Sequence, residues 1–237
     1  KPDYLFEKSR ILLNTKEYDK LIFDIEKCIK KILTGNKTDN QWMIFELLKI
    51  VCDNKIFNKS KYTEKFISFF EDNIIYLEVK YQIVLKTKMI EYFYCNLKYL
   101  KSFEYIIDLI ESTDGNIEYK LTDILNISLR KLDYTVVDRK KIMKKLKSAN
   151  KQNTNIKIKN MLLNELEILG NKTYLESRPS SLHVNLTNKC NLKCVMCHNE
   201  RAEIYDIDER LVNFIKNNMP YLQYISWLGG EVFLSKI

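Results

Sequence analysis

The sequence has little proline and glycine, with three prolines and five glycines in 237 residues. Between Asp3 and Arg178 there is no proline at all, and only three of the glycines lie there. Both residue types interrupt regular secondary structure, so their scarcity argues against a fold built from many short strands and tight turns. This long interval is instead typical of successive helices.

Long apolar runs and a leader are also lacking. No uncharged apolar stretch is long enough to cross a bilayer, and the first residues do not show the pattern of a secretory signal peptide. Cys28, Cys52 and Cys95 are widely spaced on apolar helix faces, which predicts small buried side chains rather than a disulfide framework. We therefore expect a cytoplasmic protein with no membrane partner.

What is present is helical periodicity. Leu21, Ile25, Cys28 and Ile32 recur at the 3.6-residue period, and similar stripes follow one another up to about residue 172. This predicts a mainly α chain in which residues 1–176 form a helical bundle or solenoid. The helix pairs weakly resemble tetratricopeptide repeats, although most signature positions of that repeat are absent. Such an array is a scaffold, or it holds a peptide or protein on a concave face.

Positive charge is concentrated in one window, residues 138–160. This window contains nine Lys and Arg against Asp138 as its single acid, an excess equal to the +8 of the whole chain. A solvated helix face accounts for it, and a patch for phosphate or an acidic partner is the sharper alternative. Aromatic residues interleave poorly with these lysines, which argues against binding to nucleic acid.

The pattern changes from helical to mixed at residue 177. Residues 182–187 alternate apolar and polar side chains, as in a strand, and residues 221–228 are rich in strand-forming types. Between them lies an amphipathic helix, for which Asp206 is the expected N-cap with Glu209 three residues later. The order strand, helix, strand predicts a βαβ unit with two parallel strands.

The loop between the first strand and this helix contains CNLKCVMC, in which Cys190, Cys194 and Cys197 are spaced by four and then three residues. A zinc ion would require a fourth ligand, and His198 is the nearest candidate, awkwardly adjacent to Cys197. A redox dithiol would need only CVMC. Three thiolates also suit a [4Fe-4S] cluster that keeps one iron open. The residues alone leave these alternatives open.

The cysteine motif and the end of the second strand together resemble a known family. CxxxCxxC after a first strand, followed by Gly229, Gly230 and Glu231 at the end of the second, resembles the radical S-adenosylmethionine (SAM) superfamily. The wording SRPSSLHVNLTNKCNLKCVMCHNE is similar to members that carry an additional C-terminal cluster domain, often called SPASM. The likeness covers residues 177–237, expected to be the N-terminal, incomplete part of a partial (β/α) radical SAM barrel.

The resemblance implies a role for each motif. The three cysteines would each ligate one iron of a [4Fe-4S] cluster, and SAM would chelate the fourth. Gly229, Gly230, Glu231 and Met196 would contact SAM. The implied reaction is the reductive cleavage of SAM to a 5′-deoxyadenosyl radical that acts on a peptide, protein or small metabolite. An electron donor of the flavodoxin or ferredoxin type is the implied partner.

Two expectations limit this reading. The chain contains only the first two strands of the expected barrel, so we expect it to be part of a longer polypeptide and to be inactive alone. The alternative from another class is a helical protein-interaction module whose cysteines form a structural zinc site or a vestigial one.

Overall fold

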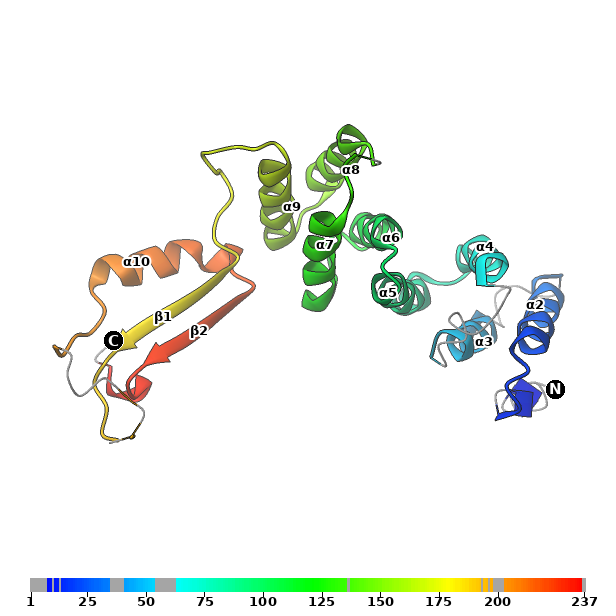
Figure 1. Ribbon diagram of the computed structural model, residues 1–237, viewed down its shortest axis with the longest axis horizontal. Coiled ribbons are helices and arrows are strands. Elements are labelled where there is room, and N and C mark those ends of the chain that lie inside the picture. Colours follow the sequence, from blue (N-terminus) through cyan, green and yellow to red (C-terminus); the bar gives the residue numbers. More distant parts are fainter. Residues whose placement is uncertain are drawn as a thin grey trace. The chain divides into compact units, whose positions relative to one another are not determined.

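The computed structural model of the protein describes residues 8–9, 11–12, 14–34, 41–53, 63–135, 137–192, 194–195, 197 and 203–235. In this part of the chain the fold is mainly helical, as expected, and includes one small parallel sheet (Figure 1). The chain forms two compact units, residues 1–109 with 123–132 and residues 110–122 with 133–237.

The first unit consists of amphipathic helices around an aliphatic and aromatic core. Its helices are α2 (Tyr18–Thr34), α3 (Gln41–Asp53), α4 (Thr63–Ile74), α5 (Val79–Cys95) and most of α6 (Tyr99–Ser112) and α7 (Tyr119–Lys131). On α2, Leu21, Ile25 and Cys28 of the predicted stripe are buried, and Ile32 is half-buried against the same core. They belong to one cluster with the fully buried rings of Phe70 and Phe93.

The three single cysteines do not share one environment. Cys28 is buried, as expected, and Cys52 is half-buried. Cys95 is exposed, so the prediction of a buried side chain was wrong for it. It is the last residue of α5, where the helix ends and no further turn of apolar residues continues the buried stripe.

The second unit contains the helices α8 (Arg139–Gln152) and α9 (Ile156–Leu169), which pack side by side. Each begins at a side-chain cap: Asp138 accepts from the backbone of the first turn of α8, and Asn155 does the same for α9. Such caps satisfy N–H groups that have no partner within the helix. The two helices thus have defined starts despite their very different compositions.

The linker from α9 to the sheet is held on α9 by buried polar side chains. Asn160 is hydrogen-bonded to both backbone groups of Arg178, at 2.7 and 2.8 Å. The carboxylate of Glu167 accepts from the backbone N–H groups of Glu176 at 2.7 Å and Ser177 at 3.2 Å. These bonds fix the path of the segment between α9 and the first strand.

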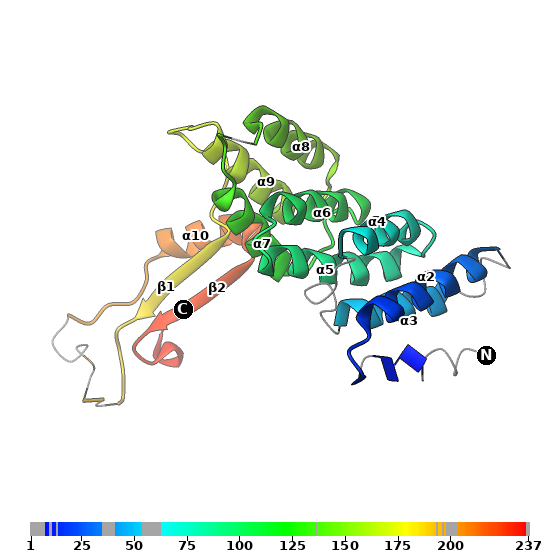
Figure 2. The ribbon, with the colours of Figure 1, turned by 45° about the vertical axis from the view of Figure 1, so that its right-hand side comes forward.

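A βαβ unit completes the second unit. Strands β1 (Ser181–Thr187) and β2 (Tyr224–Gly229) are parallel, and α10 (Glu209–Asn218) lies between them in the chain (Figure 2). The apolar face of β1 packs against α10 in a small core of its own, which includes Val184, Ile207 and Ile215. The predicted order of strand, helix and strand is therefore confirmed.

Two local predictions for this unit were wrong. The cap of α10 is Asp208, which accepts from the N–H of Leu211 at 2.9 Å, and not Asp206. Asp206 lies in an isolated antiparallel bridge with Thr187, so its backbone is extended and belongs to the sheet edge. The second strand begins at Tyr224 rather than at residue 221, because residues 219–221 form the short 3-10 helix η3 around Pro220.

Candidate functional site at the end of the parallel strands

The carboxyl ends of β1 and β2 meet at one edge of the sheet. Their parallel register pairs Ser181 with Tyr224 at one end and Thr187 with Gly229 at the other. The cysteine loop, defined here as residues 188–205, leaves from the end of β1. The glycine turn, residues 229–231, leaves from the end of β2. In open sheets with parallel strands, ligands bind outside this edge.

The glycine turn lies directly against the start of the cysteine loop. The N–H of Gly230 donates to the carbonyl of Thr187 at 2.7 Å, and the N–H of Glu231 donates to the carbonyl of Lys189 at 2.7 Å. These two bonds join the two sequence motifs through backbone atoms, one residue before Cys190. The bonds bring the glycine turn against the residues that lead into the cysteine motif.

Both glycines are required by this approach. A Cβ atom at Gly229 would lie 2.1 Å from the carbonyl oxygen of Thr187, and one at Gly230 would lie 2.1 Å from that of Lys189. Gly229 also has a φ of +122°, a conformation that L side chains rarely adopt. Since the opposing atoms are backbone, no side-chain rotation relieves either clash.

The base of the cysteine loop is closed by side chains. The amide of Asn188 donates to the carbonyl of Glu203 at 2.6 Å and accepts from the N–H of Tyr205 at 2.8 Å. Thr187, which is fully buried, donates its hydroxyl to the carbonyl of Tyr205 at 2.8 Å. Lys189 and Asp206 form an ion pair across the same base. The loop therefore leaves and returns at neighbouring points.

Sequence reasoning missed most of this closure. Thr187 is the last residue of the first predicted strand, and its hydroxyl is bonded to the carbonyl of Tyr205 and to the N–H of Lys189. Asn188 and Lys189 were not singled out, although an asparagine directly after a strand is a known local signal for side-chain bonding to nearby backbone. Their partners, Glu203 to Asp206, could not be found from spacing because the loop between has no periodicity.

All three cysteines of the motif are exposed, free thiols. The N–H of Cys197 donates to the carbonyl of Cys194 at 3.0 Å, so these two residues share a tight turn. The N–H of Leu192 approaches the sulfur of Cys190 at 3.5 Å. Among the described residues no three potential metal ligands are gathered into one cluster. Met196 and His198 lie outside the described residues.

The donor type, three thiols, suits an iron–sulfur cluster, although the described side chains are not gathered around one point. Soft thiolates are the ligands of such clusters, and the three thiols here are exposed, unpaired in disulfides and carried by one loop with a closed base. The carboxylate of Glu231 caps the 3-10 helix η4 (Val232–Leu234) by accepting from the N–H of Phe233 at 3.4 Å.

A groove of about 500 Å³ lies beside β1. It is lined by residues of β1, of the segment 205–208 and of α10. These residues are Leu182, His183, Val184, Asn185, Tyr205, Asp206, Ile207, Asp208, Leu211, Phe214 and Ile215. His183 is also in contact with the hydroxyl of Tyr224, at 3.3 Å from Nε2. No cysteine of the motif lines this groove.

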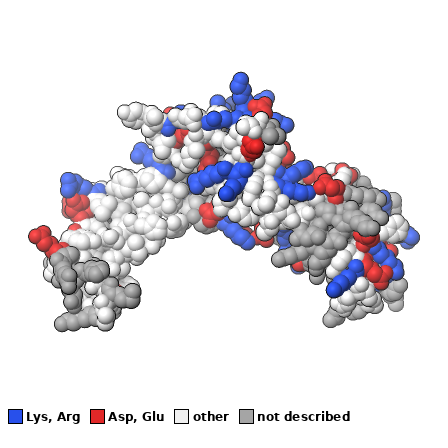
Figure 3. Space-filling view, in the orientation of Figure 1, with Lys and Arg blue, Asp and Glu red and all other residues white. Residues whose placement is uncertain are grey.

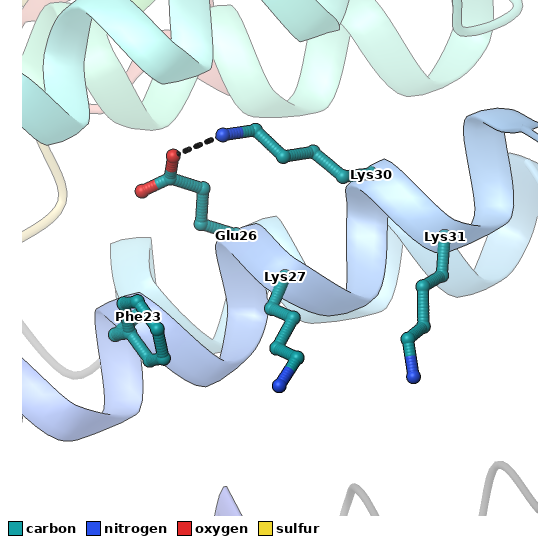
Figure 4. Close-up of a pocket in the computed structure, with 5 residues that line it drawn as sticks. All are labelled: Phe23, Glu26, Lys27, Lys30 and Lys31. Carbon is teal, nitrogen blue, oxygen red and sulfur yellow. Dashed lines mark hydrogen bonds and ion pairs between the residues drawn. The ribbon is translucent and has the colours of Figure 1, made fainter.

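A second hollow lies on α2 in the first unit (Figure 4). Its volume is about 340 Å³, and Phe23, Glu26, Lys27, Lys30 and Lys31 line it. Lys30 and Glu26 form an ion pair at 2.7 Å, whereas Lys27 and Lys31 extend away from that pair. This lining offers neither a nucleophile nor a set of metal ligands, so it adds no chemistry to the site at the sheet edge.

Comparison with protein-family models, curated proteins and solved structures found nothing that matches this chain. Among the described residues, no helix is both long enough and apolar enough to span a membrane.

Proposed function

We propose that residues 177–237 form the cofactor-binding start of a radical SAM enzyme. The observation that supports this proposal is the backbone contact between the glycine turn and the residues just before the cysteine motif, from Gly230 to Thr187 and from Glu231 to Lys189. It lies at the carboxyl edge of two parallel strands, where α/β folds bind their ligands. We further propose that β1, α10 and β2 are the first βαβ unit of a partial (β/α) barrel.

In this proposal Cys190, Cys194 and Cys197 hold three irons of a [4Fe-4S] cluster. The fourth iron would be left for SAM, and Gly229, Gly230, Glu231 and Met196 would contact SAM. When bound and reduced, the cluster supplies the electron for cleaving the sulfonium. The protein's own share is to bind and orient the cofactors and to exclude water.

The chain's residues provide that orientation through backbone and base contacts. Gly229 and Gly230 permit the turn to approach the loop, while Asn188 and the pair of Lys189 with Asp206 keep the loop's ends together. Ligands held on a closed loop lose less freedom on binding a metal than ligands on an open one. An electron donor of the flavodoxin or ferredoxin type and a peptide or protein held by the helices are the proposed partners.

Anaerobic reconstitution with iron and sulfide tests the proposal. We expect the chain to gain a broad brown visible absorption with iron and sulfide bound in equal amounts. Cys194→Ala should abolish most of the iron and the band, because three thiolates are the minimum for the cluster. Cys95→Ala is the matched control, since Cys95 is also an exposed free thiol but lies outside the motif. Full iron retention in Cys194→Ala would refute the assignment.

Metal analysis and the absorption spectrum of the same reconstituted protein distinguish this proposal from a second candidate function, a helical interaction module with a structural zinc site. The large helical share of the chain favours that function. Zinc bound in one equivalent without visible absorption, and unchanged by added iron and sulfide, would support it.

A further inference from the structure

The exposed side of α8 carries a straight line of positive charge. Lys140, Lys144, Lys147 and Lys151 are spaced by four, three and four residues, so they share one face of the helix. All four are exposed, and they lie opposite the buried residues Ile142, Leu146 and Ala149. The line is about 16 Å long at the rise of an α-helix. We name these four residues the lysine stripe.

The stripe is not compensated by negative charge. Within the described part of the chain, its four lysines make no ion pair. α8 contains no Asp or Glu at all, and its first turn carries Arg139, Lys140 and Lys141. Cations in the first turn oppose the helix dipole, and like charges at this spacing repel each other.

A helix that is merely solvated does not need this arrangement. On α2 the exposed Lys30 is paired four residues back with Glu26 at 2.7 Å, which stabilises that helix. On α8 the residues four positions before Lys144 and Lys151 are themselves lysines, Lys140 and Lys147. Figure 3 shows Lys and Arg side chains gathered over the place that α8 occupies in Figure 1. An anionic partner would remove the repulsion.

We propose that the lysine stripe is a docking surface for an Asp- and Glu-rich segment of a partner protein. Lysine is a flexible point charge, suited to carboxylates presented by a peptide rather than to the bidentate reading of phosphates or bases. The one arginine of α8, Arg139, is bound internally to the carbonyl of Leu169 and to Asn171. No residue of α8 is aromatic, so the surface offers no platform for stacking bases.

Fluorescence anisotropy with a labelled oligoglutamate peptide tests the proposal on the whole 237-residue chain at low ionic strength. The test variant is Lys144→Glu/Lys147→Glu. The matched control is Lys27→Glu/Lys31→Glu, which makes the same change of net charge on the exposed side of α2. We expect the stripe variant to weaken binding about tenfold, the scale of two reversed surface charge contacts, and the control by less than about threefold.

Three results would overturn the inference. One is an equal loss in both variants, which would show an effect of net charge alone. Another is the lack of saturable binding by the unmodified chain. The third is tighter binding of single-stranded or duplex DNA, lost in the stripe variant, which would identify a nucleic-acid surface instead.

Folding and the cofactor site are kept apart from this test. Circular dichroism checks that each variant keeps its helices, and Lys144→Gln/Lys147→Gln should weaken binding in the same direction without introducing new acids. Because the assay needs neither iron nor SAM, a failed reconstitution leaves its result unaffected. Conversely, loss of peptide binding would not alter the cluster's absorption.

Discussion

Replacing Gly230 by alanine is the sharpest perturbation of the contact between the glycine turn and the cysteine loop. The added Cβ would lie 2.1 Å from the carbonyl oxygen of Lys189 and 2.8 Å from the carbonyl carbon of Asn188. Both are backbone atoms, so the glycine turn must move away from the start of the cysteine loop. Overpacking of this kind costs about 1–3 kcal/mol. The bond from Glu231 to Lys189 lengthens or breaks as a result.

Hydrogen exchange measures this loss where it occurs. The amide of Glu231 donates to Lys189, so its protection reports whether the contact is closed. A local cost of about 1–3 kcal/mol should reduce that protection roughly 5- to 150-fold. Gly229→Ala should lose more, because its φ of +122° adds about 1–3 kcal/mol of backbone strain.

Gly170→Ala is the matched control for these variants. Gly170 has an ordinary helical conformation, and its added Cβ would lie 3.0 Å from the nearest backbone oxygen, that of Leu166. Its substitution should change stability by less than about 1 kcal/mol and leave exchange at the sheet edge unaltered. If Gly230→Ala kept the exchange of Glu231 within about twofold of the original, the argument from close approach would fail.

Three further outcomes are expected. Cys190 should react with iodoacetamide well before Cys52, because burial raises the pKa of the Cys52 thiol to about 12; equal rates by peptide mass spectrometry would contradict this. Burial alone would raise the pKa of Glu167, but hydrogen bonds from the linker outweigh it and lower that pKa. Its stabilisation is therefore present above its unfolded pKa of about 4.3 and is lost as pH falls through the lower folded value. Glu167→Gln should cost about 1–3 kcal/mol in urea unfolding at neutral pH and less in acid, whereas a loss independent of pH would exclude the charge as its cause. Asn188→Ala should speed exchange of the Tyr205 amide by opening the loop's base, and unchanged exchange there would show that the amide is dispensable.

The helices and the first strand could be predicted because their signals are local. The apolar residues Leu21, Ile25 and Cys28 recur about once per helical turn, and residues 182–187 alternate apolar and polar side chains along the strand. The N-cap of α10 was predicted at Asp206, but it is the next acidic residue, Asp208. Asp206 and Asp208 are both plausible caps by composition, and pairing with Thr187 removes Asp206 from the helix.

The candidate site divides in the same way. Its residue types were evident from spacing, since three cysteines on one loop and two glycines after a strand are short-range patterns. The closure of the loop was not evident from spacing, because Asn188 is hydrogen-bonded to Glu203 and Tyr205 across a loop without periodicity. The exposure of Cys95 and the burial of Glu167 were likewise invisible, since each depends on what packs nearby rather than on its own neighbours.

By itself, then, the sequence determined which segments are helix or strand and which chemical groups each carries, because those properties depend on neighbours within a few residues. Only the tertiary structure decided that Thr187 lies beside Gly229, since the register of two parallel strands is set by packing against α10. That register brings the carbonyls of Thr187 and Lys189 to where a Cβ would stand. The same register places the glycine turn against the start of the cysteine loop, so that only glycine fits at residues 229 and 230.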